Sequence, residues 1–258
     1  MCAIFGIYGD YNPKVVYKMA SCQISRGPDK TSYYFNKKNK ICLGMNRLAV
    51  IDKRFGNQPM LSHDKKIQTI FNGAIYNFKD IKKYLEKKSI FFKTNSDTEL
   101  LVNAYSYWGD KCFNYLDGMW AAAFYNLKNN TLTLSRDYLG QKPLFYVKDE
   151  NKLVFSSQIE GIFKYKNNFK ISKKNFELYY RFSHLPAPFT IYKNIHKLKP
   201  GEILTIRGQK VKKKIFWDIS NGPDYNFLFK KTLKVNVKEK FSNNLKNYLI
   251  SDKKPLIA

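Results

Sequence analysis

The chain has 258 residues, of which 44% are hydrophobic and 16% aromatic; this excludes global disorder and leaves room for one large domain, or a medium one plus a tail. Its 46 Lys and Arg residues outnumber 20 Asp and Glu, giving a formal net charge of +26. Such an excess ordinarily suggests nucleic acid or another anionic surface as a partner. The basic residues are mostly scattered lysines, however, and no nucleic-acid-binding motif accompanies them, so we attribute the charge to biased composition.

The cysteines and the hydropathy pattern indicate a cellular compartment. The four cysteines are spaced without a CxxC pair or nearby histidines, so the sequence suggests neither a metal site nor a disulfide framework, and a reducing compartment fits best. The sequence contains neither a signal peptide nor an apolar run of about eighteen residues that could span a membrane. A soluble, cytoplasmic protein with no membrane partner is therefore expected. The cysteines are Cys2, Cys22, Cys42 and Cys112.

Short strands and turns are predicted for most of the first two thirds of the chain. The apolar run 3–9 predicts a buried strand that begins directly after Cys2. Ser96 is followed by Asp97 and Glu99, which predicts a helix start. Antiparallel sheets covered by helices are therefore expected. The further strands are predicted at 31–36, 41–46, 67–72, 119–126, 131–135, 143–148 and 153–157, and the helices at 13–22, 78–88 and 97–107.

The last third of the chain changes in pattern. Residues 172–182 are predicted to be helical, and residues 184–201 to form a proline-bearing loop. Segments 202–207 and 210–216 are typical of a hairpin. Residues 226–250 keep apolar positions near a 3.6-residue period, which predicts an amphipathic helix.

Cys2 is the first candidate catalytic residue. Removal of the initiator methionine, which is efficient before a small side chain, would leave a thiol and a free α-amine on this one residue. The reference pKa values of these groups are about 8.5 and 8, so the amine can accept the thiol proton and later pass it to a leaving group. The alternative interpretation is an inert cysteine near the start of the chain.

A set of motifs resembles one family along nearly the whole chain. Their order is similar to that in the N-terminal glutaminase half of asparagine synthetase B, a class II glutamine amidotransferase domain. The resemblance implies the N-terminal-nucleophile hydrolase fold, an α+β architecture in which two antiparallel β-sheets are sandwiched between helical layers (αββα). The motifs are MCAIFGIYG (1–9), SRGPD (25–29), NRLAVID (46–52), NQPM (57–60), FNGAIYN (71–77), SDTELL (96–101), GMWAAAFYN (118–126), RDYLGQKPLFY (136–146), FSSQIEGI (155–162), IHKLKPGEIL (195–204) and FW (216–217).

The resemblance implies a catalytic role for three residues. Cys2 matches the nucleophile that forms a γ-glutamyl thioester while its α-amine moves the proton to departing ammonia. Asn72 and Gly73 match the oxyanion positions, with the Asn side-chain amide and the Gly main-chain N–H as donors; losing one such donor typically costs about 3 kcal/mol in the barrier. Arg26 matches a supporting arginine near the nucleophile, where a fixed positive charge favours a thiolate.

The resemblance also implies how L-glutamine is recognised. Arg47 matches the residue that grips the α-carboxylate, for which a planar guanidinium suits bidentate pairing. Asp97 matches the partner of the α-ammonium group. The implied glutamine-binding set is Arg47, Leu48, Ala49, Val50, Ile51, Asn72, Gly73, Ala74 and Asp97.

Four positions depart from the family pattern. Ala3 adds a methyl group where a smaller residue is usual, and Ser25 and Met45 each stand where relatives often have a histidine. Ala74 replaces the glutamate of an Asn-Gly-Glu motif, so it lacks the carboxylate that assists Asp97. The expected result is a loss in glutamine binding of about 1–2 kcal/mol, with the site still active.

The sequence divides into two expected parts. Residues 1–218 are predicted to form the glutaminase domain, and residues 219–258 a linker, a helix and the start of a synthetase domain. The last residues, 251–258, correspond to the segment that precedes the family's ATP-binding loop, so sites for ATP and Mg are expected to be absent, whereas the glutaminase part needs no cofactor. We therefore expect a fragment, a truncated gene or a split enzyme that depends on a synthetase domain in cis or in trans.

Several functions remain open at this point. The first is a glutaminase that supplies ammonia to β-aspartyl-AMP on a synthetase half. The second is a non-catalytic remnant that binds a partner, and the third is the amidotransferase half of another ATP-dependent synthetase. A nucleic-acid-binding protein, driven by the charge of +26, ranks last. The resemblance also allows a homodimer.

Overall fold

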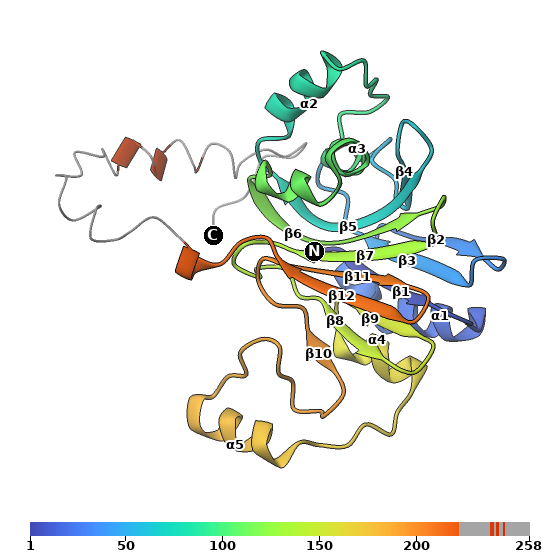
Figure 1. The fold of residues 1–258 in the computed structure, drawn as a ribbon, viewed down its shortest axis with the longest axis vertical. Helices are drawn as coiled ribbons and strands as arrows, with labels where there is room; N and C mark the ends of the chain where they lie inside the picture. Colours follow the sequence, from blue (N-terminus) through green and yellow to red (C-terminus); the bar gives the residue numbers. More distant parts are fainter. Residues whose placement is uncertain (222–237, 240, 243–244, 246–258) are drawn as a thin grey trace.

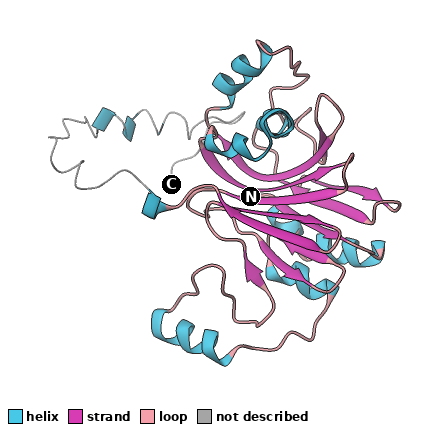
Figure 2. Ribbon diagram, in the orientation of Figure 1, coloured by secondary structure: helices cyan, strands magenta, loops and turns pink. Residues whose placement is uncertain are grey.

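Two six-stranded antiparallel sheets face each other, with helices on their outer sides (Figures 1 and 2). The computed structural model describes residues 1–221, 238–239, 241–242 and 245. The first sheet has the order β10 (His196–Lys197), β8 (Phe145–Lys148), β9 (Leu153–Ser156), β1 (Ala3–Tyr8), β3 (Ile41–Arg47) and β2 (Lys30–Asn36). The second has the order β12 (Lys210–Ile215), β11 (Glu202–Arg207), β7 (Thr131–Arg136), β6 (Gly118–Asn126), β5 (Ile67–Ile75) and β4 (Met60–Leu61).

Helices cover the outer faces of both sheets (Figure 1). The pairs on the two faces are α2 (Phe78–Glu86) with α3 (Asp97–Trp108), and α1 (Pro13–Ser21) with α4 (Ile159–Tyr165). The helix α5 (Lys173–Phe182) lies apart from these layers and buries none of its side chains. Three short 3₁₀ turns, at Ile24–Arg26, Gly109–Asn114 and Ile219–Asn221, complete the described elements.

The strand β1 contacts a hydrophobic core on each of its two faces. Ile4 and Tyr8 point into the core between the two sheets, whereas Phe5 and Ile7 point to the core beneath α1 and α4. All six residues of β1 are buried, because both faces of the sheet are covered. A strand buried on both faces needs an apolar residue at nearly every position. The chain therefore enters the core directly after Cys2.

The remaining core confirms the four-layer arrangement. Trp120 of β6 and Phe113 lie in an apolar cluster that also includes Leu100 and Leu101 of α3 and Leu85 of α2. Together with the core between the sheets and the core under α1 and α4, this cluster separates four layers, helix, sheet, sheet and helix. The predicted αββα architecture is correct.

Most predicted elements are present, and the differences have local causes. The strand β5 continues through Asn72 and Gly73 to Ile75, because these residues pair with Ala121, Trp120 and Gly118 of β6. An Asn-Gly pair, often a hairpin turn, is here part of a strand.

Two further differences concern short or undescribed segments. The helix α4 was not predicted; it has only seven residues and no side-chain N-cap, and Gly161 sits inside it. A Cβ atom at Gly161 would lie 2.3 Å from Ser156 Oγ, so the close approach of helix and sheet requires glycine. The predicted helix 226–250 lies largely outside the described residues, although the five described positions within it are helical.

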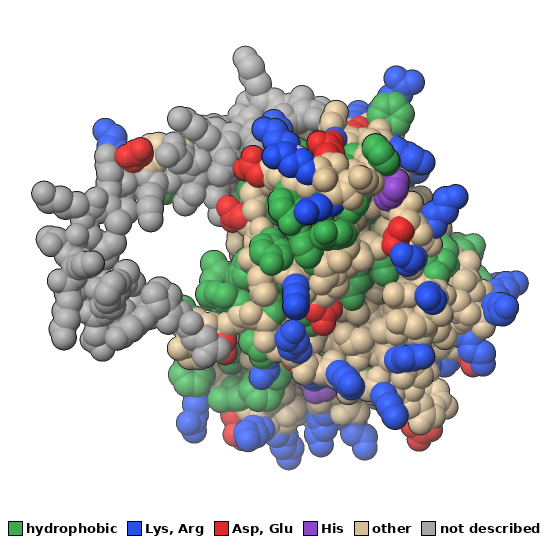
Figure 3. All heavy atoms as spheres, turned by 45° about the horizontal axis from the view of Figure 1, so that its top comes forward, with side chains coloured by type: hydrophobic (Ala, Val, Ile, Leu, Met, Phe, Trp, Pro, Cys, Tyr) green, Lys and Arg blue, Asp and Glu red, His purple; other side chains and the backbone are tan. Residues whose placement is uncertain are grey.

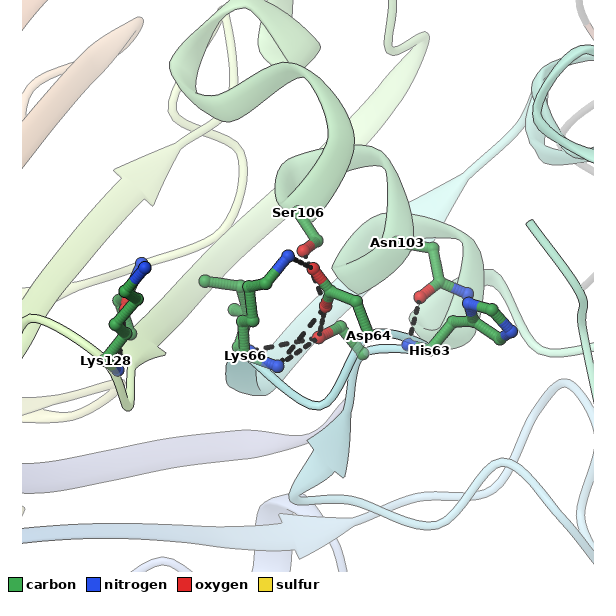
Figure 4. Close-up of polar contacts among 9 residues, drawn as sticks. His63, Asp64, Lys66, Asn103, Ser106 and Lys128 are labelled. Carbon is green, nitrogen blue, oxygen red and sulfur yellow. Dashed lines mark hydrogen bonds and ion pairs between the residues drawn. The ribbon is translucent and has the colours of Figure 1, made fainter. Parts of the chain in front are cut away.

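A polar cluster fixes α3 to the turn between β4 and β5 (Figure 4). The carboxylate of Asp64 accepts hydrogen bonds from Ser62 Oγ at 2.6 Å and Ser106 Oγ at 2.8 Å, and pairs with Lys66 Nζ. Burial favours its neutral form, but the hydrogen bonds from Lys66, Ser62 and Ser106 outweigh burial and lower the pKa of Asp64 to about 2. The C-terminal half of α3 is thereby held against the edge of the second sheet.

The surface carries its charge in dispersed form. Figure 3 shows Lys and Arg side chains scattered over the visible face, with few Asp and Glu side chains between them. Three ion pairs occur among the described residues, all with partly exposed side chains. Surface pairs of this kind contribute about 0–1 kcal/mol each. None of the helices in the described part of the chain is long and apolar enough to cross a membrane.

Candidate active site

A cavity of about 470 Å³ opens where the two sheets meet, at the N-terminal end of β1. Its walls come from the start of β1, the end of β3, the second half of β5 and the start of α3. Nine residues predicted from the sequence line it, namely Cys2, Arg47, Leu48, Val50, Ile51, Asn72, Gly73, Ala74 and Asp97. Two predicted residues do not line it: Arg26 lies behind Cys2, and Ala49 donates its N–H to Asp29 Oδ2 at 2.8 Å.

The thiol of Cys2 lies against the main chain of Leu48. The Leu48 N–H donates to Cys2 Sγ at 3.4 Å, and the thiol lies 3.5 Å from the Leu48 carbonyl oxygen. Burial raises the pKa of the Cys2 thiol; the Leu48 hydrogen bond, the chain's amino terminus and Arg47 act in the opposite direction. The sulfur is thus held in one place by the end of β3, and it needs help to ionise.

Two cations lie near the start of the chain, Arg26 at the main chain of Cys2 and Lys142 at the side chain of Met1. Arg26 Nε donates to the Cys2 carbonyl at 3.2 Å, and Arg26 Nη2 is buried with no hydrogen-bond partner in the described part of the chain. Lys142 lines the cavity, and its Nζ contacts Met1 Sδ at 3.4 Å. Burial lowers the pKa of the Met1 amine, and the charges of Arg26 and Lys142 lower it further. A role near the nucleophile was predicted for Arg26 but not for Lys142.

Asn72 and Gly73 lie side by side on β5 at the cavity wall. The exposed fraction of Asn72 is 2%, yet its Nδ2 has no hydrogen-bond partner among the described residues. Buried amide groups are normally satisfied, so an orphan donor facing a cavity is suited to an oxygen that arrives with a substrate. A Cβ atom at Gly73 would lie 2.0 Å from the Met119 carbonyl oxygen. Glycine therefore lets β5 approach β6 closely at this point.

Asp97 is the first residue of α3 and is buried at the cavity. Its Oδ2 accepts the Ile75 N–H at 3.2 Å, which ties the helix to the end of β5. Burial raises its pKa from 3.8 to about 6, although hydrogen bonds from the Ile75, Thr98 and Asp97 N–H groups and the charge of Arg47 oppose the shift. A carboxylate in such a place gains from a cationic ligand that replaces its lost hydration.

The guanidinium of Arg47 is occupied by its own loop. Its Nη1 donates to the carbonyl of Lys53 at 3.0 Å and to Asn57 Oδ1 at 3.4 Å. Its Nη2 donates to the carbonyls of Ile51 at 3.1 Å and Asp52 at 2.8 Å. In this conformation Arg47 shapes the loop that borders the cavity, and a carboxylate can reach its terminal nitrogens only by exchange with one of these partners.

The structure also identifies cavity residues that the sequence analysis did not. Gln58 Nε2 donates to Thr98 Oγ1 at 3.0 Å, and Gln58 Oε1 accepts the Phe71 N–H at 2.6 Å. Gln58 therefore links α3 to β5 across the floor of the cavity. Its only signal in the sequence was the motif NQPM, which by itself implied no role. The further lining residues without a predicted role are Met1, Gly56, Ile75, Tyr76, Ser96, Met119 and Lys142.

The residues that depart from the family pattern fall in different places. Met45 and Ala74 line the cavity, where they present apolar groups. Ser25 is exposed and lies outside the cavity lining. The substitutions at positions 45 and 74 therefore change the surface that meets a ligand, whereas the one at position 25 does not.

The loop that carries Lys142 is held by the buried Asp137 and the partly buried Arg136. Asp137 accepts hydrogen bonds from the N–H groups of Trp120, Leu139, Gln141 and Lys142 at 2.8–3.2 Å. Arg136 Nε donates to the Lys142 carbonyl at 2.7 Å, and its other nitrogens donate to the carbonyls of Leu198 and Gly140. The residues of the motif RDYLGQKPLFY thus mainly hold one loop in place at the cavity.

Comparison with known proteins identifies the family of the chain. The glutamine amidotransferase domain family matches residues 1–217, and the chain belongs to that family. The glutamine-hydrolyzing asparagine synthetases 1 and 3 of Bacillus subtilis are both 29% identical to the chain, over 245 and 262 residues. These matches cover 92% and 98% of the chain, but 36% and 42% of the two relatives. The chain thus spans less than half the length of these curated relatives.

Solved structures show the same fold. Glutamine phosphoribosylpyrophosphate amidotransferase from Bacillus subtilis, complexed with ADP and GMP, is similar with a TM-score of 0.62 and 20% sequence identity over 84% of this chain and 49% of that one. A structure described as the allosteric regulatory enzyme of purine biosynthesis has a TM-score of 0.63 and 19% identity. The predicted N-terminal-nucleophile fold is therefore confirmed.

Proposed function

We propose that this domain hydrolyses the side-chain amide of L-glutamine, with Cys2 as the nucleophile. The observation that carries the proposal is the cavity in which the thiol of Cys2, the orphan Nδ2 of Asn72 and the buried carboxylate of Asp97 lie together. A nucleophile, an oxyanion donor and an anionic anchor are the parts that recognition and cleavage of an amino-acid amide need.

The proposed reaction proceeds through a thioester. Once Met1 is removed, the α-amine of Cys2 takes the thiol proton, and Sγ attacks the amide carbon of glutamine. Asn72 Nδ2 and the Gly73 N–H donate to the oxygen of the tetrahedral intermediate. The carbon–nitrogen bond then breaks, and the proton passes from the amine to the nitrogen, which leaves as ammonia. Water hydrolyses the thioester to glutamate and restores the thiol.

Recognition of the amino-acid end uses the two charged residues of the cavity. Asp97 accepts the α-ammonium group, which restores solvation to its buried carboxylate. Arg47 binds the α-carboxylate in exchange for one loop contact, and the 3.4 Å contact with Asn57 is the weakest of the four. Leu48, Val50 and Ile51 line the same cavity, and Ala49, which lies between them in the chain, supports this segment through its bond to Asp29. Because Ala74 adds no second carboxylate, affinity rests on Asp97.

The ammonia is destined for a synthetase partner in this proposal. The relatives named above are asparagine synthetases more than twice as long as the matched region, which supports β-aspartyl-AMP as acceptor. The ATP and Mg of that second reaction belong to the partner, in cis or in trans, and the glutaminase step uses no cofactor. We place the domain boundary near residue 218, and a homodimer and a cytoplasmic location are part of the same proposal.

Labelling with 6-diazo-5-oxo-L-norleucine, a glutamine analogue that alkylates active nucleophiles, tests the proposal. Mass spectrometry of the intact chain is expected to show loss of Met1 and one adduct on Cys2, blocked by glutamine. The variant Cys2→Ala is the control for site, and Cys22→Ala, outside the cavity, is the matched cysteine control that keeps the adduct. A processed and folded chain that takes no adduct contradicts glutaminase function and favours a non-catalytic, partner-binding remnant.

A further inference from the structure

Lys142 is a buried lysine without a carboxylate partner. Its exposed fraction is 7%, and it lines the cavity together with Cys2 and Met1. None of the ion pairs in the described part of the chain includes it, and the hydrogen bond of its Nζ goes to Met1 Sδ at 3.4 Å. Burial lowers the pKa of the Lys142 ammonium group, and the charge of Asp137, which makes no ion pair with it, only partly opposes this effect.

The structural role of position 142 does not need this ammonium group. The loop is held through the main chain of Lys142, whose N–H binds Asp137 Oδ2 at 3.0 Å and whose carbonyl binds Arg136 Nε at 2.7 Å. A neutral residue could make both contacts. The side chain therefore places in the cavity a positive charge that has no ion-pair partner among the described residues. This charge is unfavourable for stability, and the loop does not need it to keep its conformation.

A second cation without an ion-pair partner among the described residues lies at the main chain of Cys2. Arg26 contacts the Cys2 carbonyl through Nε at 3.2 Å, while its Nη2 is buried and orphaned within the described residues. Both cations act on the amino terminus. Burial is the largest cause that lowers the pKa of the Met1 amine, and Arg26 and Lys142 act in the same direction. After removal of Met1, the free amine belongs to Cys2, the residue whose carbonyl accepts the hydrogen bond from Arg26.

We propose that Lys142 is a positioning residue whose charge, beside that of Arg26, keeps the free amine of processed Cys2 neutral and able to accept the thiol proton. Two fixed positive charges disfavour a third one on the amine and favour negative charge on the sulfur. The inference rests on the proposed function, in which that amine is the base. The proton moves from Sγ to the amine and then to the departing nitrogen, and Lys142 keeps its own protons throughout.

The other charged groups near the nucleophile oppose or support this effect. The sulfur of Cys2 and, to a smaller extent, Asp29 favour the charged amine, and Asp29 Oδ2 is also engaged by the Ala49 N–H at 2.8 Å. Asp97 disfavours the thiolate, and Arg47 favours it. The guanidinium of Arg47 is bound by its own loop, whereas Arg26 Nη2 and Lys142 Nζ have no carbonyl or carboxylate partner among the described residues.

Titration of the amine tests the proposal without glutamine turnover. In a Cys2→Ser background, which keeps a small residue after Met1, the rate of α-amine acetylation by acetic anhydride is followed against pH by mass spectrometry. In the Cys2→Ser chain we expect the midpoint to lie below the ordinary value of about 8. In Lys142→Met the midpoint should rise by about one pH unit, which corresponds to a tenfold loss of neutral amine. Lys142→Arg keeps the midpoint, and the exposed Lys128→Met is the matched control.

The outcomes separate this proposal from the glutaminase function. An unshifted midpoint in folded Lys142→Met overturns the role of Lys142 even if the glutamine analogue labels Cys2. A shifted midpoint in a chain that the analogue does not label supports the role of Lys142 and contradicts the glutaminase function. If Lys142→Met does not fold, Lys142→Gln, which keeps a polar side chain, takes its place with the same expected shift.

Discussion

Asn72 is the residue whose environment most clearly anticipates a substrate. Its buried Nδ2 donates to no described residue, so removing the amide costs the fold no hydrogen bond. We expect Asn72→Ala to lower the rate of glutamine hydrolysis by about 10²–10³-fold, the usual effect of losing one oxyanion donor. The thermal unfolding temperature should change little.

Two measurements check this prediction, release of glutamate for activity and a thermal melt for stability. Asn129→Ala, in an exposed turn, is the matched control and should alter neither. A loss of stability in Asn72→Ala as large as its loss of activity would mean that Asn72 serves the fold instead.

Asp97 makes stability depend on pH in a specific direction. Because burial raises its pKa from 3.8 to about 6, the folded chain retains a proton that the unfolded chain loses between these values. Its contribution to stability is present below about pH 4 and is lost as the pH rises through 6. Asp97→Asn should therefore gain stability relative to the unsubstituted chain between pH 4 and 7, by about 1.4 kcal/mol per unit of pKa shift. Urea unfolding at both pH values measures the difference.

Glutamine should reverse that loss if Asp97 binds the α-ammonium group. In a Cys2→Ala background, which prevents turnover, glutamine is expected to raise the melting temperature more at pH 7.5 than at pH 5, because the carboxylate must be charged. The effect should vanish in Asp97→Asn. Equal stabilisation at both pH values would place the ammonium group elsewhere.

Among the elements, the loop between β7 and β8 depends on one buried carboxylate. Asp137 is fully buried and accepts four main-chain N–H groups, so Asp137→Ala leaves those donors unsatisfied. We expect a destabilisation of about 3 kcal/mol or more, together with slower labelling of Cys2, because Lys142 loses its support. The midpoint of urea unfolding measures the first effect and analogue labelling the second.

The matched control for Asp137 is a carboxylate on the surface. Asp10 pairs with Lys40 at 3.1 Å, with side chains 70% and 60% exposed. Asp10→Ala should change stability by less than about 0.5 kcal/mol, as is usual for exposed pairs. Similar losses in both variants would contradict the role assigned to the loop.

At the level of single strands and helices, the accuracy of the sequence predictions follows from how local the signals are. Short apolar runs bounded by turn residues placed the buried strands correctly, as in β1 and β6. Local pattern did not predict α4, whose seven residues surround a glycine needed for contact with Ser156. It also did not extend β5 beyond Asn72, because only pairing with β6 keeps an Asn-Gly pair extended.

At the scale of the whole molecule, the net charge of +26 is expected to destabilise the folded state through repulsion between its many Lys and Arg side chains. The described residues hold few carboxylates near their many lysines, so screening by salt is expected to favour the folded state. We expect the melting temperature to rise by a few degrees between about 20 and 300 mM NaCl, measured against an uncharged osmolyte as control. No rise would mean that the charges are already balanced in the folded chain.

Nucleic acid should bind the same chain only through this charge. Any affinity for a generic DNA duplex is expected to fall steeply with salt and to leave Cys2 labelling unchanged. Fluorescence anisotropy at several salt concentrations measures the slope. Sequence-dependent binding that survives 300 mM NaCl would contradict our attribution of the charge to composition.

The sequence by itself determined the layered fold and much of the cavity wall. Short apolar runs between turns predicted the strands, and the resemblance of the motifs to a family identified Cys2, Asn72 and Asp97, which line one cavity in the structure. Only the tertiary structure decided what Arg47, Gln58 and Lys142 do there. The contacts of these side chains depend on residues that are distant in the sequence. Carbonyl groups of its own loop bind Arg47, Thr98 of α3 binds Gln58, and Lys142 contacts Met1 instead of a carboxylate. Such contacts leave no periodic trace in the chain, since burial and charge at one position are fixed by distant residues.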